Sequence, residues 1–156
     1  NTFAATIAQG NSSSFTYKAT GDSNTAALTA GGTGDIAGTD FDFEATGDSN
    51  VLTFIQGDAA TATGGNQDFA VTGTSNNIAA KCNVVGCINN WTVSGNSNDI
   101  DTVQSGRQDH DITVVLTGSS NDVDVDQTDT ASTNIANVIS TTSNGVINVD
   151  QCASGC

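Results

Sequence analysis

The chain has 156 residues and a formal net charge of −14, and its three Lys and Arg residues are too few to form the basic surface that binds nucleic acid. No apolar run is long enough to cross a bilayer, so neither nucleic-acid binding nor membrane insertion is expected. With 17 Gly, no Pro, a single Glu and a surplus of Thr, Ser, Asn and Val, the composition predicts an all-β protein.

Residues 1–10 open the chain with an alternating pattern. Ala5, Ile7 and Gln9 are spaced two residues apart, as expected for the inward face of a half-buried strand. We expect this segment to be a half-coil, which is one strand followed by a return loop.

Residues 11–151 repeat a four-residue signature that ends in Ser-Asn. Its Gly and small polar residues are typical of a tight turn with positive φ angles. Successive copies begin 22 to 26 residues apart, a period that indicates a solenoid. The six copies are Gly21–Asn24, Gly47–Asn50, Gly73–Asn76, Gly95–Asn98, Gly118–Asn121 and a degenerate Thr141–Asn144.

A strand is predicted on each side of every signature, because side chains alternate there at period two. Before the signatures, the predicted inward residues are Phe15, Tyr17 and Ala19; Phe41, Phe43 and Ala45; Phe69 and Val71; Trp91 and Val93; Ile112, Val114 and Leu116; Ile135 and Ile139. After the signatures, they are Ala26, Leu28 and Ala30; Leu52, Phe54 and Gln56; Ile78, Ala80 and Cys82; Ile100, Thr102 and Gln104; Val123, Val125 and Gln127; and, with Gly145 as an extra turn residue, Ile147, Val149 and Gln151.

One such coil buries too few side chains to fold alone, so the coils are expected to stack into a single β-solenoid domain over residues 1–156. Residues 152–156 form a Cys-containing tail. Stacking at about 4.8 Å places equivalent residues in columns, the first of which is a ladder of the signature Asn residues. The other two columns are Gln9, Gln56, Gln104, Gln127 and Gln151, and Thr20, Thr46, Thr72, Ser94, Thr117 and Ser140.

The four Cys residues form two close pairs in the sequence. Pairing of Cys82 with Cys87 and of Cys152 with Cys156 as local disulfides fits an oxidising, extracellular compartment. The alternative is a zinc site with all four thiolates as ligands, but neither pair is accompanied by His at ligand spacing.

The repeat resembles the curlin-type repeat of bacterial functional amyloids, in which a strand, a Gly-x-x-Asn turn, a second strand and a Gln-x-Gly return alternate. The segments that carry the resemblance are Gly47–Asn50 with Gln56-Gly57, and Gly95–Asn98 with Gln104-Ser105-Gly106. The resemblance implies a subunit that is secreted unfolded, adds to the end of an existing fibre, and serves a biofilm matrix or surface adhesion.

Acidic residues on the predicted outward face are concentrated in two neighbouring coils. Stacking places them about 5 Å apart, where like charges repel by about 1 kcal/mol per pair in water. A bound calcium ion would offset this repulsion, and the alternative is a solvated acidic surface that keeps fibres soluble. We call these five residues the acidic strip; they are Asp99, Asp101, Asp122, Asp124 and Asp126.

The sequence offers little for catalysis. His110 is the sole His and stands between Asp109 and Asp111, where we expect a solvated entry into a strand rather than an acid–base site. Two glycosylation sequons, at Asn11 and Asn90, are expected by chance in a chain so rich in Asn, Ser and Thr. A non-enzymatic protein without a cofactor, calcium excepted, is therefore expected.

The expected function is that of a structural subunit of an extracellular fibre, and its expected partner is a second copy of itself. The chain offers no obvious polar cap at either end, so head-to-tail polymerisation through the terminal coils is expected. The inward residues at these edges are Ala5 and Ile7 at one end and Ile147 and Val149 at the other. The alternative is a monomeric secreted solenoid that binds a ligand, such as an adhesin or a calcium-binding or ice-binding module.

Overall fold

A computed structural model of the chain describes residues 1–7, 14–31, 38, 40–57, 65–83, 86–106, 110–129 and 134–153. Every regular element in these ranges is a β-strand. The strands are β1 (Thr2–Ile7), β2 (Ser14–Thr20), β3 (Thr25–Ala30), β4 (Asp40–Thr46), β5 (Val51–Gln56), β6 (Asn66–Thr72), β7 (Asn77–Cys82), β8 (Ile88–Ser94), β9 (Asp99–Gly106), β10 (Asp111–Ser119), β11 (Asp122–Asp129), β12 (Ile135–Ser143) and β13 (Val146–Ala153).

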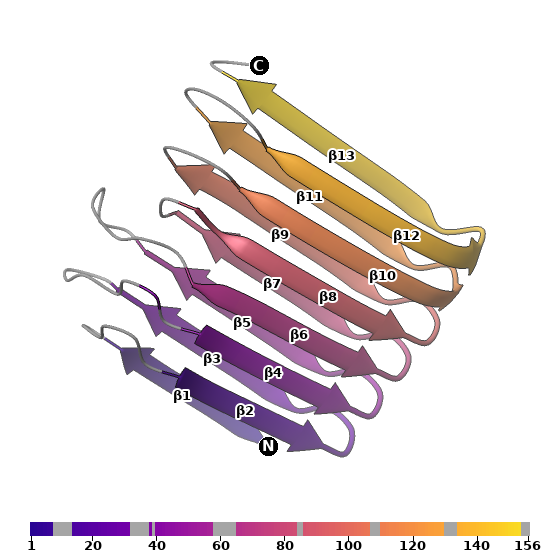
Figure 1. Cartoon of the computed structure of the whole chain (residues 1–156). Helices are drawn as coiled ribbons and strands as arrows, with labels where there is room; N and C mark the ends of the chain where they lie inside the picture. Colours follow the sequence, from indigo (N-terminus) through magenta and orange to yellow (C-terminus); the bar gives the residue numbers. More distant parts are fainter. Residues whose placement is uncertain are drawn as a thin grey trace.

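The strands alternate between two parallel sheets that face each other (Figure 1). The odd-numbered strands form a seven-stranded sheet in the order β1-β3-β5-β7-β9-β11-β13, and the even-numbered strands form a six-stranded sheet from β2 to β12. Paired residues in successive coils are between 22 and 26 positions apart. The structure therefore confirms the predicted all-β solenoid of tandem repeats, with one tight turn per coil at one edge, the turn end, and longer connections at the other, the return end.

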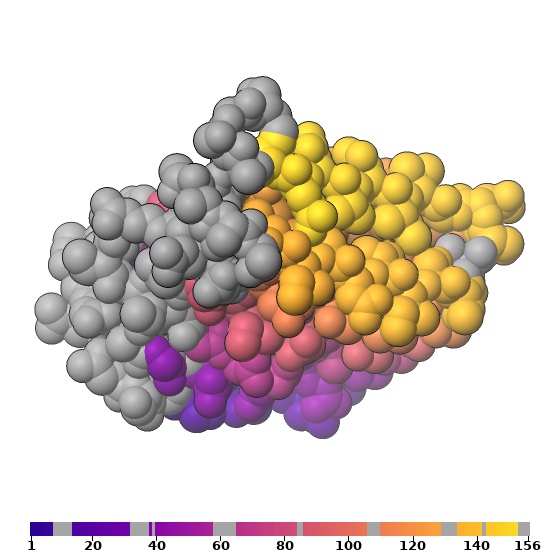
Figure 2. Space-filling model, turned by 45° about the horizontal axis from the view of Figure 1, so that its top comes forward, coloured from indigo at the N-terminus to yellow at the C-terminus, as the bar shows by residue number. Residues whose placement is uncertain are grey.

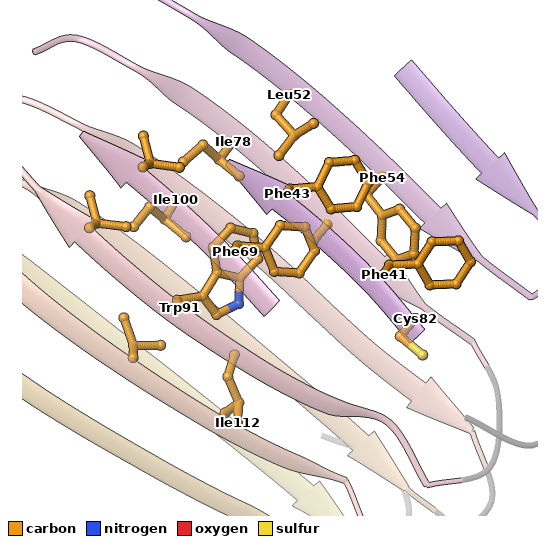
Figure 3. Close-up of a cluster of buried hydrophobic side chains, with 14 of the residues drawn as sticks. Phe41, Phe43, Leu52, Phe54, Phe69, Ile78, Cys82, Trp91, Ile100 and Ile112 are labelled. Atoms are coloured by element: carbon orange, nitrogen blue, oxygen red, sulfur yellow. The ribbon is translucent and has the colours of Figure 1, made fainter. Parts of the chain in front are cut away.

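The interior is built from the residues that alternate inward along each strand. Aromatic rings fill the first coils, where Phe69 stacks on Trp91 with ring centroids 3.9 Å apart (Figure 3). Ile and Val fill the later coils, and Ile112, Val114, Val123 and Val125 are fully buried. In the five coils with a Gly-containing signature, the predicted inward residues are buried, except for Phe15 and Tyr17 near the first strand, which are half-buried.

The signature turns explain the Gly and Ser positions. In the five Gly-containing signatures the third residue is a Ser with φ near 57°, as at Ser49 with φ 58°, and the first is a Gly with positive φ, as at Gly47 with φ 126°. A Cβ on Gly47 would lie 2.5 Å from the carbonyl oxygen of Gly21 in the neighbouring coil. Glycine is thus required both by its own φ and by the close stacking of the turns.

The sixth coil departs from the predicted alignment by one residue before its turn. Thr141 pairs with Thr117, and Ala136 and Val138 pair with the inward Ile112 and Val114. The predicted inward residues of this strand are therefore wrong, and so is the place of Ser140 in the predicted column of Thr and Ser residues, because Ser140 pairs with Leu116. Ile135 and Ile139 point outward and are 54 % and 51 % exposed.

The physical reason for the shift is the identity of the residue with positive φ. Asn144, with φ 57°, takes the backbone conformation that Ser120 has in the preceding turn. Asn tolerates this conformation, so the turn slides by one residue and Gly145 takes the position of the ladder Asn. Asn144 is therefore not part of the Asn ladder. After the turn, Ile147, Val149 and Gln151 pair with Val123, Val125 and Gln127, as predicted with Gly145 as an extra turn residue.

Candidate functional site

The buried asparagines form a continuous ladder at the turn end. Asn24 and Asn50 close their own turns, as where Asn50 Nδ2 donates to the Gly47 carbonyl over 2.7 Å. Each also joins two coils, because Asn50 N–H donates to Asn76 Oδ1 over 2.9 Å. The same contacts link Asn24, Asn50, Asn76, Asn98 and Asn121, all of which are at most 4 % exposed.

The ladder extends one position further toward the N-terminus than the signatures indicate, and it stops one coil short at the other end. Asn1 donates to Asn24 Oδ1 over 3.0 Å, although no signature was recognised there. At the opposite end, Asn121 Nδ2 is buried without a hydrogen-bond partner, and Gly145 occupies the place of the next acceptor. The last coil is therefore less well tied to the solenoid than the coils before it.

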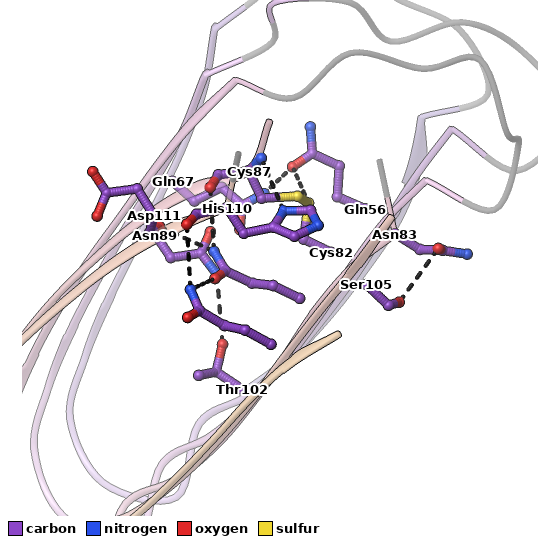
Figure 4. The surroundings of a disulfide bond; sticks show 12 residues. Gln56, Gln67, Cys82, Asn83, Cys87, Asn89, Thr102, Ser105, His110 and Asp111 are labelled. Atoms are coloured by element: carbon purple, nitrogen blue, oxygen red, sulfur yellow. Dashed lines mark hydrogen bonds between the residues drawn. A yellow bond between two sulfur atoms is a disulfide. The ribbon is translucent and has the colours of Figure 1, made fainter. Parts of the chain in front are cut away.

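The return end has a polar interior (Figure 4). Gln127 donates to Gln104 and accepts from Gln151, both over 2.6 Å, so part of the predicted Gln column is a real hydrogen-bonded ladder. Cys82 lies in register between Gln56 and Gln104 and interrupts the column. Gln9, the first predicted member, lies outside the described residues.

A disulfide joins Cys82 and Cys87 in this interior, and both residues are fully buried. The zinc alternative loses these two ligands. Cys152 is also disulfide-bonded, and its predicted partner Cys156 lies outside the described residues.

His110 is buried, contrary to the expected solvated position. It immediately precedes β10, next to Cys87 in the neighbouring coil, and its Nδ1 accepts a 3.4 Å hydrogen bond from the Cys87 N–H. The imidazole therefore packs in the solenoid interior. Asp109 of the predicted triplet lies outside the described residues.

Gln67 and Asn89 were not predicted as interior residues, but both are fully buried. Gln67 hydrogen-bonds Gln56, and Asn89 Nδ2 donates to Thr102 Oγ1 over 3.5 Å. Both continue the period-two count two residues before Phe69 and Trp91. The period-two alternation therefore indicated that both residues face inward, but their polar side chains suggested an exposed position.

The acidic strip lies on the outward face of the seven-stranded sheet, as predicted. Asp99 pairs with Asp122 and Asp101 with Asp124 in the register of β9 and β11. Burial raises the pKa of Asp101, and the charge of Asp124 adds to this effect. Burial also raises the pKa of Asp126, again with a contribution from Asp124.

Side-chain amides donate hydrogen bonds to two of these carboxylates, which offsets part of the charge repulsion within the acidic strip. Asn77 Nδ2 donates to Asp99 and Asn148 Nδ2 to Asp124, each over 3.1 Å. Across the described ranges, no three His, Cys, Asp or Glu side chains are grouped so as to hold a metal ion. Calcium uptake by the strip stays a prediction. The same ranges contain no helix with the length and apolar character needed to span a membrane.

The two ends of the solenoid expose interior residues that are covered in the middle coils. Ile147 and Val149 on β13 are 41 % and 39 % exposed. At the other end, Phe3, Ala5 and Ile7 on β1 are only partly buried against the core. The C-terminal coil forms a broad end surface in Figure 2, where β12 and β13 are orange and yellow.

No family model, curated protein or solved structure matches the chain.

Proposed function

We propose that this chain is a structural subunit that stacks end to end with further copies into an extracellular, curli-like fibre, in a biofilm matrix or in surface adhesion. The observation that most directly supports this proposal is the exposure of Ile147 and Val149. At the same positions in β11, Val123 and Val125 are fully buried, because the next strand, β13, covers them. A further coil on β13 would remove this apolar surface from water.

The backbone of the terminal strands supports the same proposal. Within the described chain, β1 pairs with β3 alone and β13 with β11 alone. An open strand edge presents N–H and C=O groups that recruit another strand. Since all pairing within the two sheets is parallel, another copy of the same repeat is a suitable template.

Charge on the outward face also favours contact through the ends. The acidic row continues from Asp126 to Asp150 on the end strand β13, whereas the outward residues of β1 are the uncharged Thr2, Ala4 and Thr6. Approach of β1 to β13 or to β12 therefore brings no acidic ladder against another one. The acidic strip itself supports the alternative function, a binding module for a cation, but it lacks a grouped set of metal ligands.

Seeded elongation tests the proposal with two matched valines. Val149 on β13 and Val51 on β5 are each 39 % exposed, but Val149 faces the interior at the end and Val51 faces outward in the middle. Dilute chain is added to sheared fibres, and the loss of soluble protein is followed by sedimentation. We expect Val149→Lys to stop elongation and Val51→Lys to elongate like the original chain.

The N-terminal end is tested in the same way with Ala5→Lys and, as its control, Ala70→Lys on the outward face of β6. Equal elongation of the end variants and their controls would refute assembly through the ends. A stable monomer of the unaltered chain at high concentration, measured by light scattering, would refute the fibre itself.

A further inference from the structure

The two sheets are offset along the solenoid axis by about half a strand spacing. Gln104 in β9 donates to the carbonyl of Cys87, just before β8, over 3.3 Å and to that of Asp111, at the start of β10, over 3.0 Å. Gln127 in β11 likewise reaches the carbonyls of His110 and Ile135, before β10 and at the start of β12, over 3.5 and 3.1 Å. Along the axis, β9 therefore lies between β8 and β10, and β11 lies between β10 and β12.

The described chain contributes an odd number of strands to this spiral, seven on one side and six on the other. If the next copy were stacked in the same orientation, its β1 would pair with β13. Its β2 would then lie two strand spacings from β12, about 9.6 Å, and the six-stranded sheet would lack one strand at every junction. Unpaired backbone groups inside such a gap are unfavourable.

On the basis of the end-to-end assembly proposed above, we propose that successive copies are rotated by about 180° about the solenoid axis, so that each sheet of one copy continues as the other sheet of the next. In this arrangement, β1 of the next copy pairs with β12, and its β2 pairs with β13. Because the offset is half a strand spacing, both pairs close at the normal distance. Strand direction is also preserved, since the rotation reverses strand direction and exchanges the two sheets.

Within the chain, every strand pair places inward residues beside inward residues. The interior residues match across the junction when the same rule is applied there. Ile147 and Val149 meet Phe15 and Tyr17 of the next copy, both of which are half-buried in the single chain. On the opposite side, Val138 meets Ala5. The two exposed apolar ends therefore cover each other with no charged residue between them.

Charges on the outward face favour the same arrangement. The alignment that places Ile147 on Phe15 also places Asp150 beside Lys18 of the next copy. Lys18 already forms an ion pair with Glu44 in the adjacent strand at 2.7 Å, so the junction extends this pair to a row of three alternating charges. In the unrotated stack, Asp150 faces the uncharged Thr6 instead. Charge complementarity therefore selects the rotated copy.

Zero-length carbodiimide cross-linking tests this contact on the unaltered 156-residue chain. The reagent joins a Lys amine to a carboxylate only when the two are in contact, and mass spectrometry identifies the linked peptides. We expect a Lys18–Asp150 link in fibres and not in dilute chain, because β2 and β13 lie at opposite ends of one copy. The Lys18–Glu44 link is the internal control and is expected in both samples.

Electron microscopy of the same fibres supplies the symmetry. The rotated stack predicts a rotation near 180° and a rise of about 31 Å per copy, six and a half strand spacings, whereas the unrotated stack predicts no reversal of the sheets and about 34 Å. Fibres that show the unrotated symmetry, or that give the Lys18–Glu44 link without the Lys18–Asp150 link, overturn the inference and leave the proposed function intact. Absence of fibres removes both.

Discussion

Val123 and Ile147 occupy the same inward column on neighbouring strands, yet Val123 is fully buried and Ile147 is 41 % exposed. The same contrast holds at the turn end. Asn121 is a buried member of the Asn ladder, whereas the equivalent residue of the last coil is Gly145, which has no side-chain amide. The middle coils thus have both neighbours that the repeat requires, and the last coil has one. A side chain in this fold is stabilised by the coil on each side of it, so its energetic role depends on its place along the axis.

The largest expected effect of this contrast is on core truncation. Ile100 in β9 is fully buried, and its replacement by Ala leaves a cavity between two coils, at an expected cost of about 2–5 kcal/mol in the free energy of unfolding. Ile147→Ala removes the same atoms from the exposed end of the same column, at an expected cost of roughly 1 kcal/mol or less. Urea unfolding of dilute chain measures both.

The exposed end makes the opposite prediction for assembly. Since Ile147 becomes covered only when another copy is added, Ile147→Ala should weaken elongation more than its small effect on the single chain suggests. Equal destabilisation of the single chain by Ile100→Ala and Ile147→Ala would show that the last coil is as well covered as the middle ones, and the comparison would fail.

A smaller effect is expected where the Asn ladder ends. Unlike the signature glycines, Gly145 does not have a positive φ, so a side chain is compatible with its backbone. The variant Gly145→Asn would offer its Oδ1 to the buried Nδ2 of Asn121, and we expect it to raise the free energy of unfolding by about 1 kcal/mol. Gly145→Ala is the control, because it restricts the unfolded chain without supplying an acceptor. If both variants have the same urea midpoint, the hydrogen bond contributes nothing.

The regular part of this fold could be predicted because each coil repeats the same physical requirements. Positive φ at the third turn residue, glycine at the first and period-two burial recur in five coils, and each copy reinforces the others. The sixth coil differs from its predicted alignment because its Ser143-Asn144 pair does not take the turn positions of the Ser-Asn pair in the other signatures. The backbone instead matched Asn144 with Ser120 by their φ angles, 57° and 55°.

The return end could not be predicted to the same extent. His110 is buried beside Cys87 of the neighbouring coil. The sequence does not fix this contact, because the number of residues between the strands at the return end differs from coil to coil. Gln67 and Asn89 were accessible to the period-two count but contradict the expectation that inward residues are apolar. Their burial depends on polar partners from the facing sheet, which a single sequence does not identify.

The smallest expected effect concerns pH and compares the acidic strip with the turns. The raised pKa of Asp101 comes from burial and from the neighbouring Asp124. A carboxyl with a raised folded-state pKa binds its proton more readily in the folded chain than in the unfolded one. Its contribution to stability therefore grows as the pH falls from above the raised pKa toward the unfolded value, and it weakens as the pH rises through the same window.

Asp48 in the second signature turn has the opposite sign. Its pKa is lowered, first by the hydrogen bond that its carboxylate accepts from the Thr74 N–H at 2.7 Å. Its stabilising contribution is therefore present above the unfolded pKa and is lost as the pH falls through the folded one. Asp101→Asn should raise stability at neutral pH and remove part of the gain on mild acidification, whereas Asp48→Asn should remove part of the loss at lower pH.

Urea midpoints of the original chain and the two variants, taken at intervals from pH 7 to pH 3 at low salt, separate these contributions. Added salt should diminish the Asp101 effect, since screening acts on repulsion between exposed charges. If Asp101→Asn and Asp48→Asn shift the pH profile in the same direction, then the strip is not strained by its own charge.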